Sequence, residues 1–305
     1  MMADIISNLF LVMAAGWAFR KYGLLPATAD EVLNRYLYYA ALPALTFVKV
    51  SDTPLWELGS DFLIANTLPV AALMALITLL WLARALSWRF ARLLVITAAL
   101  GNTAYLGFPV VSMRLGEKAL GCAAVVSSLQ NVLIFTLGLL LINLICEGSC
   151  PGLAGLKRLV LRNFVLWASV AGLAVSWFAV PVPAVLRAAL SDIGGTAMPL
   201  ALFTIGAGFY GKSAAGNGAK LAVIAALKLL VLPLFYLLTA YLLGFEGTAA
   251  RAGYLQSCMP VAVMTYVLAK EFDFDAQLVS QAIVFTTICF LPLLVLYDLA
   301  MPALL

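Results

Sequence analysis

The sequence predicts an all-α polytopic membrane protein with ten transmembrane helices, arranged as two inverted five-helix repeats with broken, crossing helices 4 and 9. Apolar residues make up 65% of the 305 positions and charged residues 10%, whereas soluble domains have roughly 45–50% apolar and about 25% charged residues. The apolar residues form continuous runs long enough to cross a bilayer as helices, and proline motifs recur in both halves. This composition excludes a water-soluble enzyme and disfavours a barrel of alternating strands.

Charged residues, glycines and prolines separate ten apolar runs, and each run is expected to form one helix. The expected helices cover residues 4–20, 36–50, 60–83, 93–113, 117–145, 163–180, 193–210, 220–244, 249–270 and 275–299. Twelve lysines and arginines fall in one set of alternate loops and five in the other. The positive-inside rule then places both termini outside the cell, in a multi-pass protein of a bacterial inner membrane.

Three short motifs occur in the same order in the two halves of the chain. Leu25-Pro26 is echoed by Val182-Pro183, Leu42-Pro43 by Met198-Pro199, and Pro109-Val110 by Pro260-Val261. We therefore expect one repeat over residues 1–146, a cytoplasmic linker over 147–162 and a second repeat over 163–305. Because each repeat has an odd number of helices, the second copy inserts upside down, as in many secondary carriers.

Two prolines are expected to interrupt helices at matching places in the repeats. Pro109 cannot donate to the carbonyl of Tyr105, and Pro260 cannot donate to that of Gln256. Since proline suits the first turn of a helix, each is expected to begin a half-helix whose positive end could hold an anion. The alternative is a pair of ordinary proline kinks.

Polar residues gather at the level of these prolines, and such residues either bind a ligand or bond across helices. Lys228 either extends to the cytoplasmic surface or acts as a counter-charge to a substrate. The candidate substrate-binding residues are Asn102, Thr103, Tyr105, Pro109, Gln130, Asn131, Lys228, Pro260, Thr265 and Tyr266.

The chain lacks the histidines and the mid-helix carboxylates that catalysis or metal binding would need. The chain has no histidine and a net charge of +4, and no Asp or Glu falls squarely within an expected helix. We therefore expect no catalytic residues, no metal site, no cofactor and no nucleic-acid partner. Sodium coupling stays open, because backbone carbonyls at broken helices can hold Na⁺.

The sequence resembles the auxin efflux carrier family, whose bacterial members are associated with small dicarboxylates such as malonate or malate. The resemblance covers nearly the whole chain and rests on Gly16–Leu25, Leu42–Leu45, Asn102–Pro109, Leu129–Asn131 and Pro260–Glu271. It implies a fold akin to bile-acid sodium symporters. It also implies a scaffold of helices 1, 2, 6 and 7 that usually dimerises, and a moving domain of helices 3–5 and 8–10. Asn102 matches an asparagine near the substrate carboxylate, whereas Asn66 and Val70 lie near the positions of an acid and a lysine in plant auxin carriers.

We therefore expect a secondary carrier that exports a small organic anion by an elevator-like motion, with the lipid bilayer and a second copy of the chain as its partners. Two alternatives stay open from the sequence. One is sodium-coupled uptake of an organic anion, and the other is a membrane sensor that binds a ligand without transporting it.

Overall fold

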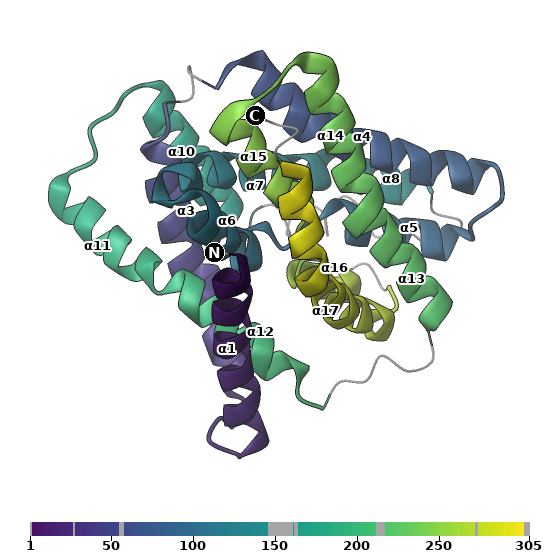
Figure 1. Cartoon of the computed structure of the whole chain (residues 1–305), viewed down its shortest axis with the longest axis horizontal. Coiled ribbons are helices and arrows are strands. Elements are labelled where there is room, and N and C mark those ends of the chain that lie inside the picture. Colours follow the sequence, from purple (N-terminus) through teal and green to yellow (C-terminus); the bar gives the residue numbers. More distant parts are fainter. Residues whose placement is uncertain are drawn as a thin grey trace. The chain divides into compact units, whose positions relative to one another are not determined.

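The computed structural model describes residues 2–26, 28–54, 58–145, 161, 164–211, 217–271 and 274–301, and most of these residues are helical (Figure 1). Within these ranges, extended backbone pairs at one place, an isolated antiparallel bridge between Gly101 and Val261. The predicted all-α class is confirmed for the described chain.

Five helical stretches of the described residues are long and apolar enough to cross a membrane. They are Gly59–Leu82, Glu117–Leu144, Ala184–Phe209, Gly218–Leu243 and Ala276–Ala300. Each of the ten expected ranges contains helix, but 93–113 and 249–270 are interrupted. The count of ten membrane-crossing helices and their inverted arrangement stay predictions.

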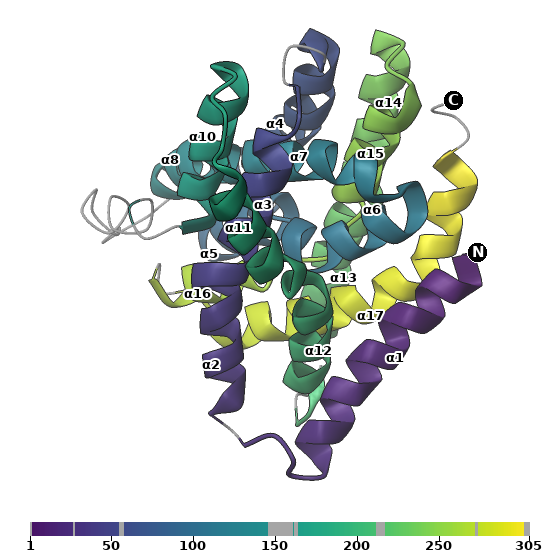
Figure 2. The ribbon, with the colours of Figure 1, turned by 90° about the vertical axis from the view of Figure 1, so that its left-hand side faces the viewer.

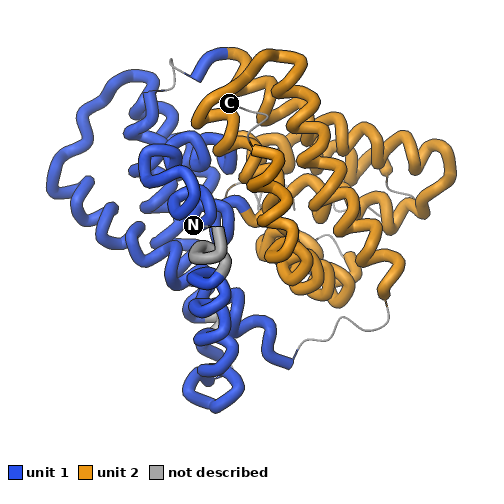
Figure 3. The backbone as a smooth tube through the Cα atoms, viewed as in Figure 1, with its two compact units in different colours: residues 1–59, 103–128, 163–212 blue, residues 60–102, 129–162, 213–305 orange. Residues whose placement is uncertain are grey.

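The chain divides into two compact units, and both halves of the sequence contribute to each (Figure 3). Unit 1 contains residues 1–59, 103–128 and 163–212, and unit 2 contains 60–102, 129–162 and 213–305. The predicted linker 147–162 lies outside the described residues, apart from Leu161. The predicted repeat boundary remains a prediction.

Unit 1 is built around two closely packed sets of helices. Its elements are α1 (Met2–Lys21), α2 (Ala29–Tyr36), η1 (Leu37–Ala41), α3 (Leu42–Ser51), η3 (Thr103–Gly107), α6 (Phe108–Leu115), η4 (Glu117–Ala119), most of α7 (Leu120–Leu133), α10 (Phe164–Trp177), α11 (Ala184–Gly195) and α12 (Ala197–Phe209). Helix α3 packs against α10 and α11, and α1 lies beside α12 (Figure 2).

The α1–α12 pair depends on two glycines that allow the backbones to approach. A Cβ atom at Gly16 would lie 1.9 Å from the carbonyl oxygen of Phe203, and one at Gly206 would lie 1.8 Å from that of Met13. Small residues at membrane helix interfaces allow this close packing. The two helices therefore depend on glycine at both positions.

Unit 2 surrounds α5, in which every residue from Ala91 to Ala99 is buried. Its elements are α4 (Gly59–Leu82), α5 (Trp88–Ala99), the end of α7, η5 (Ile134–Gly138), α8 (Leu139–Leu144), α13 (Gly218–Ala226), η6 (Leu227–Val231), α14 (Leu232–Leu243), α15 (Gly247–Ser257), α16 (Met264–Glu271) and α17 (Ala276–Ala300). Helices α13, α16 and α17 and the turn η6 all contact α5. Unit 2 therefore brings segments of both sequence halves around one buried helix.

Three of the helices begin in the same way, with proline as their second residue directly after a π-helical turn. These prolines are Pro43 after η1, Pro109 after η3 and Pro233 after η6. Proline lacks the N–H that an α-helix needs and its ring crowds the carbonyl four residues earlier. The wider π turn relieves this crowding, and such turns are frequent at functional sites.

Candidate functional site

Two helix interruptions meet inside unit 2. Helix α5 ends at Ala99 and Leu100 is extended, while α15 ends at Ser257 and α16 begins only at Met264. The N–H of Asn102 donates to the carbonyl of Pro260 at 2.8 Å, and that of Ala262 donates to the carbonyl of Leu100 at 3.1 Å. These bonds flank the Gly101–Val261 bridge, so each interruption supplies the backbone partners of the other.

The positions of these interruptions correct the sequence prediction in both repeats. Pro109 does not begin the half-helix at the break. The chain resumes as π-helix at Thr103, and Pro109 is the second residue of α6. Pro260 does not begin α16, because it lies within the non-helical segment. Proline disfavours helix at the residue before it, so α15 ends upstream of Pro260.

A threonine on α17 supports the bridge from a third helix. The hydroxyl of Thr286 accepts a hydrogen bond from the N–H of Val261 at 3.2 Å and donates to the carbonyl of Ala282 at 2.7 Å. Thr286 is fully buried. It therefore provides an acceptor for the N–H of Val261, which lies beyond the end of α15 and outside any helix.

Two of the candidate amide side chains in unit 2 are buried with an unsatisfied atom. Asn102 is 3% exposed and Gln130 on α7 is 2% exposed. Within the described residues, the side-chain nitrogen Nδ2 of Asn102 and the oxygen Oε1 of Gln130 have no hydrogen-bond partner. A buried polar atom left unpaired costs about 1–3 kcal/mol, so each is available to a ligand.

Lys228 is the charged candidate, and the structure buries it. Its side chain is 0% exposed, and its Nζ has no hydrogen-bond partner among the described residues. The alternative in which Lys228 extends to the surface is therefore wrong. Its turn η6 contacts α5, and its side chain lies near that of Cys258, which caps the end of α15. Lys228 thus lies beside the end of α15 that leads into the bridge.

The other candidates divide between the two units. In unit 1, the hydroxyl of Thr103 pairs with that of Ser127 at 2.8 Å, Tyr105 is half-buried and Pro109 is buried. In unit 2, Thr265 is fully buried and donates to the carbonyl of Ala262 at 2.6 Å. Asn131 is half-buried on α7, and Tyr266 is exposed on α16.

Sequence reasoning missed three residues that contact this region, namely Thr286, Cys258 and Tyr297. Thr286 could have been found from the adjacent threonines in an otherwise apolar run, since hydroxyls in membrane helices commonly bond to backbone. Cys258 and Tyr297 carried no such signal, because cysteine and tyrosine are common in apolar cores.

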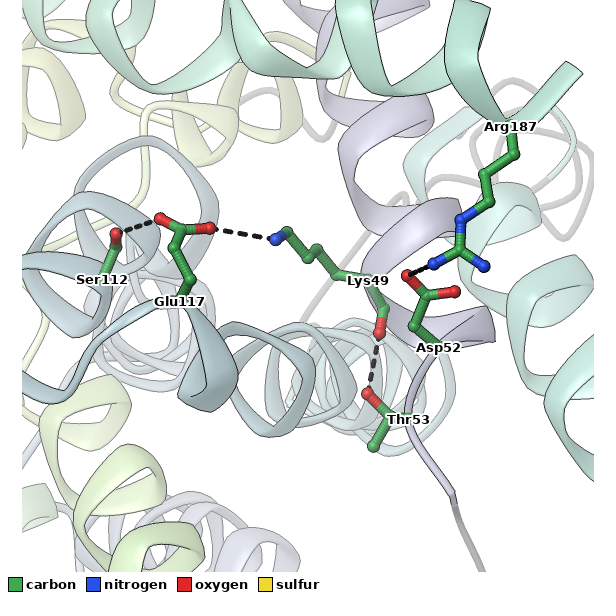
Figure 4. A network of polar contacts seen from close by, with 6 residues as sticks. All are labelled: Lys49, Asp52, Thr53, Ser112, Glu117 and Arg187. Carbon is green, nitrogen blue, oxygen red and sulfur yellow. Dashed lines mark hydrogen bonds and ion pairs between the residues drawn. The ribbon is translucent and has the colours of Figure 1, made fainter. Parts of the chain in front are cut away.

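A second polar cluster lies in unit 1, at the end of α3 (Figure 4). Lys49 pairs with Glu117 at 3.0 Å, and Glu117 also accepts from the hydroxyl of Ser112. Asp52 pairs with Arg187 of α11 at 2.7 Å. Both ion pairs are solvent-exposed, where such pairs contribute at most about 1 kcal/mol. The cluster joins helices and offers no buried binding site.

Metal-ligating side chains are also dispersed in the described chain. No group of three or more Cys, Asp or Glu residues within those ranges is arranged to hold a metal ion. The buried polar groups of unit 2 include amides, hydroxyls, the guanidinium of Arg92 and the ammonium of Lys228, and cationic groups repel a metal cation.

An apolar helical chain whose broken helices pair at buried polar groups has the features of a membrane transporter. A family model described as "Membrane transport protein" matches residues 2–149 and 154–298. The chain belongs to this family, the auxin efflux carrier family, and is an integral membrane protein.

Three relatives illustrate the breadth of the family. An "Uncharacterized transporter" of Methanothermobacter thermautotrophicus is 27% identical over 97% of each chain. A protein of Rhizobium meliloti named "Putative malonate transporter" is 27% identical over 86% of this chain and 84% of its own length. "Auxin efflux carrier component 1" of Arabidopsis thaliana is 24% identical over 46% of this chain and 24% of its own length.

Proposed function

We propose that this transporter is a secondary carrier that exports a small organic anion, a carboxylate or dicarboxylate, bound at the paired interruptions of unit 2. The observation that carries this proposal is the buried ammonium of Lys228 beside the break that holds Asn102, since neither Nζ of Lys228 nor Nδ2 of Asn102 has a hydrogen-bond partner in the part of the chain that the structure describes. The malonate in the name of the Rhizobium meliloti relative agrees with this substrate class.

The electrostatics of unit 2 favour an anion over a cation or a neutral solute. Removing an ammonium from water costs several kcal/mol unless an opposite charge compensates it. A carboxylate beside Lys228 would supply that charge, and the Nδ2 group of Asn102 would donate to a second oxygen or to a second carboxylate. Each donor would then be satisfied only in the loaded carrier.

The membrane potential supplies a direction for this transport. With the cell interior negative, an anion gains about 2.3 kcal/mol per charge per 100 mV by leaving. Export therefore needs no coupling ion.

We further propose an elevator-like motion in which helices 3–5 and 8–10 carry the anion past a dimeric scaffold of helices 1, 2, 6 and 7. Residues 1–59 and 163–212, which include the expected scaffold helices, fall in one compact unit, and residues 103–128 of the expected moving helices belong to the same unit. In this proposal the protein lies in a bacterial inner membrane with both termini outside, as the positive-inside rule favours.

Counterflow in proteoliposomes tests the function directly. Purified protein is reconstituted, the vesicles are loaded with unlabelled malonate, and uptake of labelled malonate, malate, succinate and a neutral analogue is measured. We expect carboxylate uptake above protein-free vesicles and none of the neutral analogue. No carboxylate flux from folded protein would overturn the proposal, and binding without flux would favour the sensor.

Two further conditions decide coupling and direction. Replacing sodium by choline on both sides is expected to leave the flux unchanged, and a strict sodium requirement would favour coupled uptake. An inside-negative potential set with potassium and valinomycin is expected to accelerate release of the anion from right-side-out vesicles, because net negative charge leaves.

A further inference from the structure

The turn that carries Lys228 has a backbone carbonyl with no α-helical donor. In an α-helix, the carbonyl of Leu229 would accept from the N–H of residue 233. That residue is Pro233, which has no N–H. The π-helical turn Leu227–Val231 lies directly before this proline, so the turn needs a donor from outside its own helix.

That donor comes from α17. The hydroxyl of Tyr297 donates to the carbonyl of Leu229 at 2.5 Å, and Tyr297 is buried. Its ring also lies against two others, with centroid distances of 6.3 Å to Tyr254 of α15 and 6.2 Å to Phe290. Tyr254 is one helical turn before Cys258, whose N–H donates to its carbonyl at 3.1 Å. One side chain therefore contacts both the turn bearing Lys228 and the helix end that the ammonium faces.

We propose that Tyr297 is a positioning residue for anion binding, which holds the turn η6 through the Leu229 carbonyl and so keeps the Lys228 ammonium beside the end of α15. This inference rests on the proposed function for its consequence, because Lys228 matters only if an anion binds there. Its structural part, the order of η6, does not depend on any substrate. Tyr297 itself is not proposed to touch the anion.

The substitution Tyr297→Phe removes the hydroxyl and keeps the ring contacts. Tyr236→Phe is the matched control, because the hydroxyl of Tyr236 donates to the carbonyl of Ala250 at 2.9 Å and is equally buried in unit 2. Tyr297→Phe leaves the Leu229 carbonyl without a donor, whereas the Ala250 carbonyl lies inside α15 and keeps its intrahelical partner, so Tyr236→Phe is expected to lose no more thermal stability than Tyr297→Phe. Only Tyr297→Phe loosens the turn that bears Lys228.

The first measurement needs no ligand. Amide hydrogen exchange of the full-length protein in nanodiscs is expected to rise at least tenfold in the segment 227–232 for Tyr297→Phe, and to stay at the wild-type rate there for Tyr236→Phe. Unchanged exchange in this segment for Tyr297→Phe would overturn the inference, whatever the transport assay shows.

The second measurement asks whether the effect passes through Lys228. In malonate counterflow, Tyr297→Phe is expected to raise the half-saturation concentration roughly tenfold, as for a lost interaction of about 1.4 kcal/mol, with a smaller change in maximal rate. In a Lys228→Gln background, adding Tyr297→Phe is expected to change the half-saturation concentration less than twofold. If the two substitutions instead multiply their effects independently, the inference is overturned, and so it is if Tyr236→Phe has an equal effect.

If wild-type protein transports no carboxylate, the proposed function fails, while the hydrogen-exchange result still decides the role of Tyr297 in ordering η6.

Discussion

The backbone N–H of Asn102 donates to the carbonyl of Pro260 at 2.8 Å, and this bond joins residues from opposite halves of the sequence. It uses the backbone of Asn102 and leaves the side-chain Nδ2 without a partner in the described residues. The same residue therefore holds the two interruptions together and presents a free donor beside them. Substitutions can separate these two roles, because a side-chain change keeps the backbone bond.

The substitution Asn102→Ala is expected to lower malonate transport at least tenfold while shifting the melting temperature by less than about 2 °C. The alanine keeps the backbone N–H and removes only an amide whose donor is already unpaired. Asn143→Ala is the control, since the side chain of Asn143 donates to the carbonyl of Leu139 in its own helix at 3.0 Å. Equal transport by both variants would remove Asn102 from the site.

The substitution Lys228→Met is expected to change stability and transport in opposite directions. Removing a buried, unpaired charge while keeping its volume should stabilise the ligand-free protein by about 1 kcal/mol or more. Loss of the counter-charge should lower anion transport roughly a hundredfold, about 2.7 kcal/mol of binding. Lys220→Met, at an exposed position of α13, should change neither. A destabilised Lys228→Met protein with normal transport would contradict the assignment.

The substitution Thr286→Val tests the support of the bridge. It leaves the N–H of Val261 without its acceptor in a buried site, which should cost about 1–3 kcal/mol and lower the melting temperature measurably. Thr287→Val is a neighbouring control, because the hydroxyl of Thr287 donates to the carbonyl of Ile283 within α17 at 2.7 Å. We expect the control to stay near wild type, and equal shifts would mean that Thr286 contributes only to its own helix.

The two ion pairs at the end of α3 are expected to differ in transport. In the proposed elevator motion, Lys49–Glu117 joins the scaffold to the moving helices, whereas Asp52–Arg187 lies within the scaffold. Glu117→Gln should therefore change the maximal transport rate threefold or more, and Arg187→Gln less than twofold. Both should change stability by less than about 1 kcal/mol, since exposed pairs contribute little. The same rate change in both variants would argue against a boundary between α3 and η4.

Two glycines of α12 are expected to differ in how much stability an alanine substitution costs, because only one of them packs against α1. Gly206→Ala places a methyl group against the backbone of Met13, so the helices must separate and the melting temperature should fall by several degrees, as for an overpacked core that loses about 1–3 kcal/mol. A Cβ at Gly208 of α12 meets no atom within 4 Å. Gly208→Ala should be neutral or stabilising, because alanine favours helix by up to about 1 kcal/mol.

Local chemistry explains how much of the site could be predicted. The missing N–H of proline is a local property, so Pro109 and Pro260 marked the two interrupted helices correctly. The first break was placed too far along the chain, because a π turn at Thr103–Gly107 accommodates Pro109. Whether a proline produces a kink, a π turn or a break depends on which neighbours accept and donate the remaining hydrogen bonds, and those neighbours are distant in sequence.

The amino-acid sequence by itself determined the environment and the class of structure. An apolar chain in a bilayer has no water to satisfy its backbone, and its continuous apolar runs favour helices over the alternating strands of a barrel. The tertiary structure alone decided that Gly101 pairs with Val261, that Thr286 and Tyr297 satisfy the backbone groups freed nearby, and that Asn102 and Lys228 keep donors that have no partner among the described residues. A hydrogen bond needs two partners in contact, and here the two partners lie on different elements that are far apart in the sequence. Neither hydrophobic periodicity nor a short motif shows which distant residues come into contact.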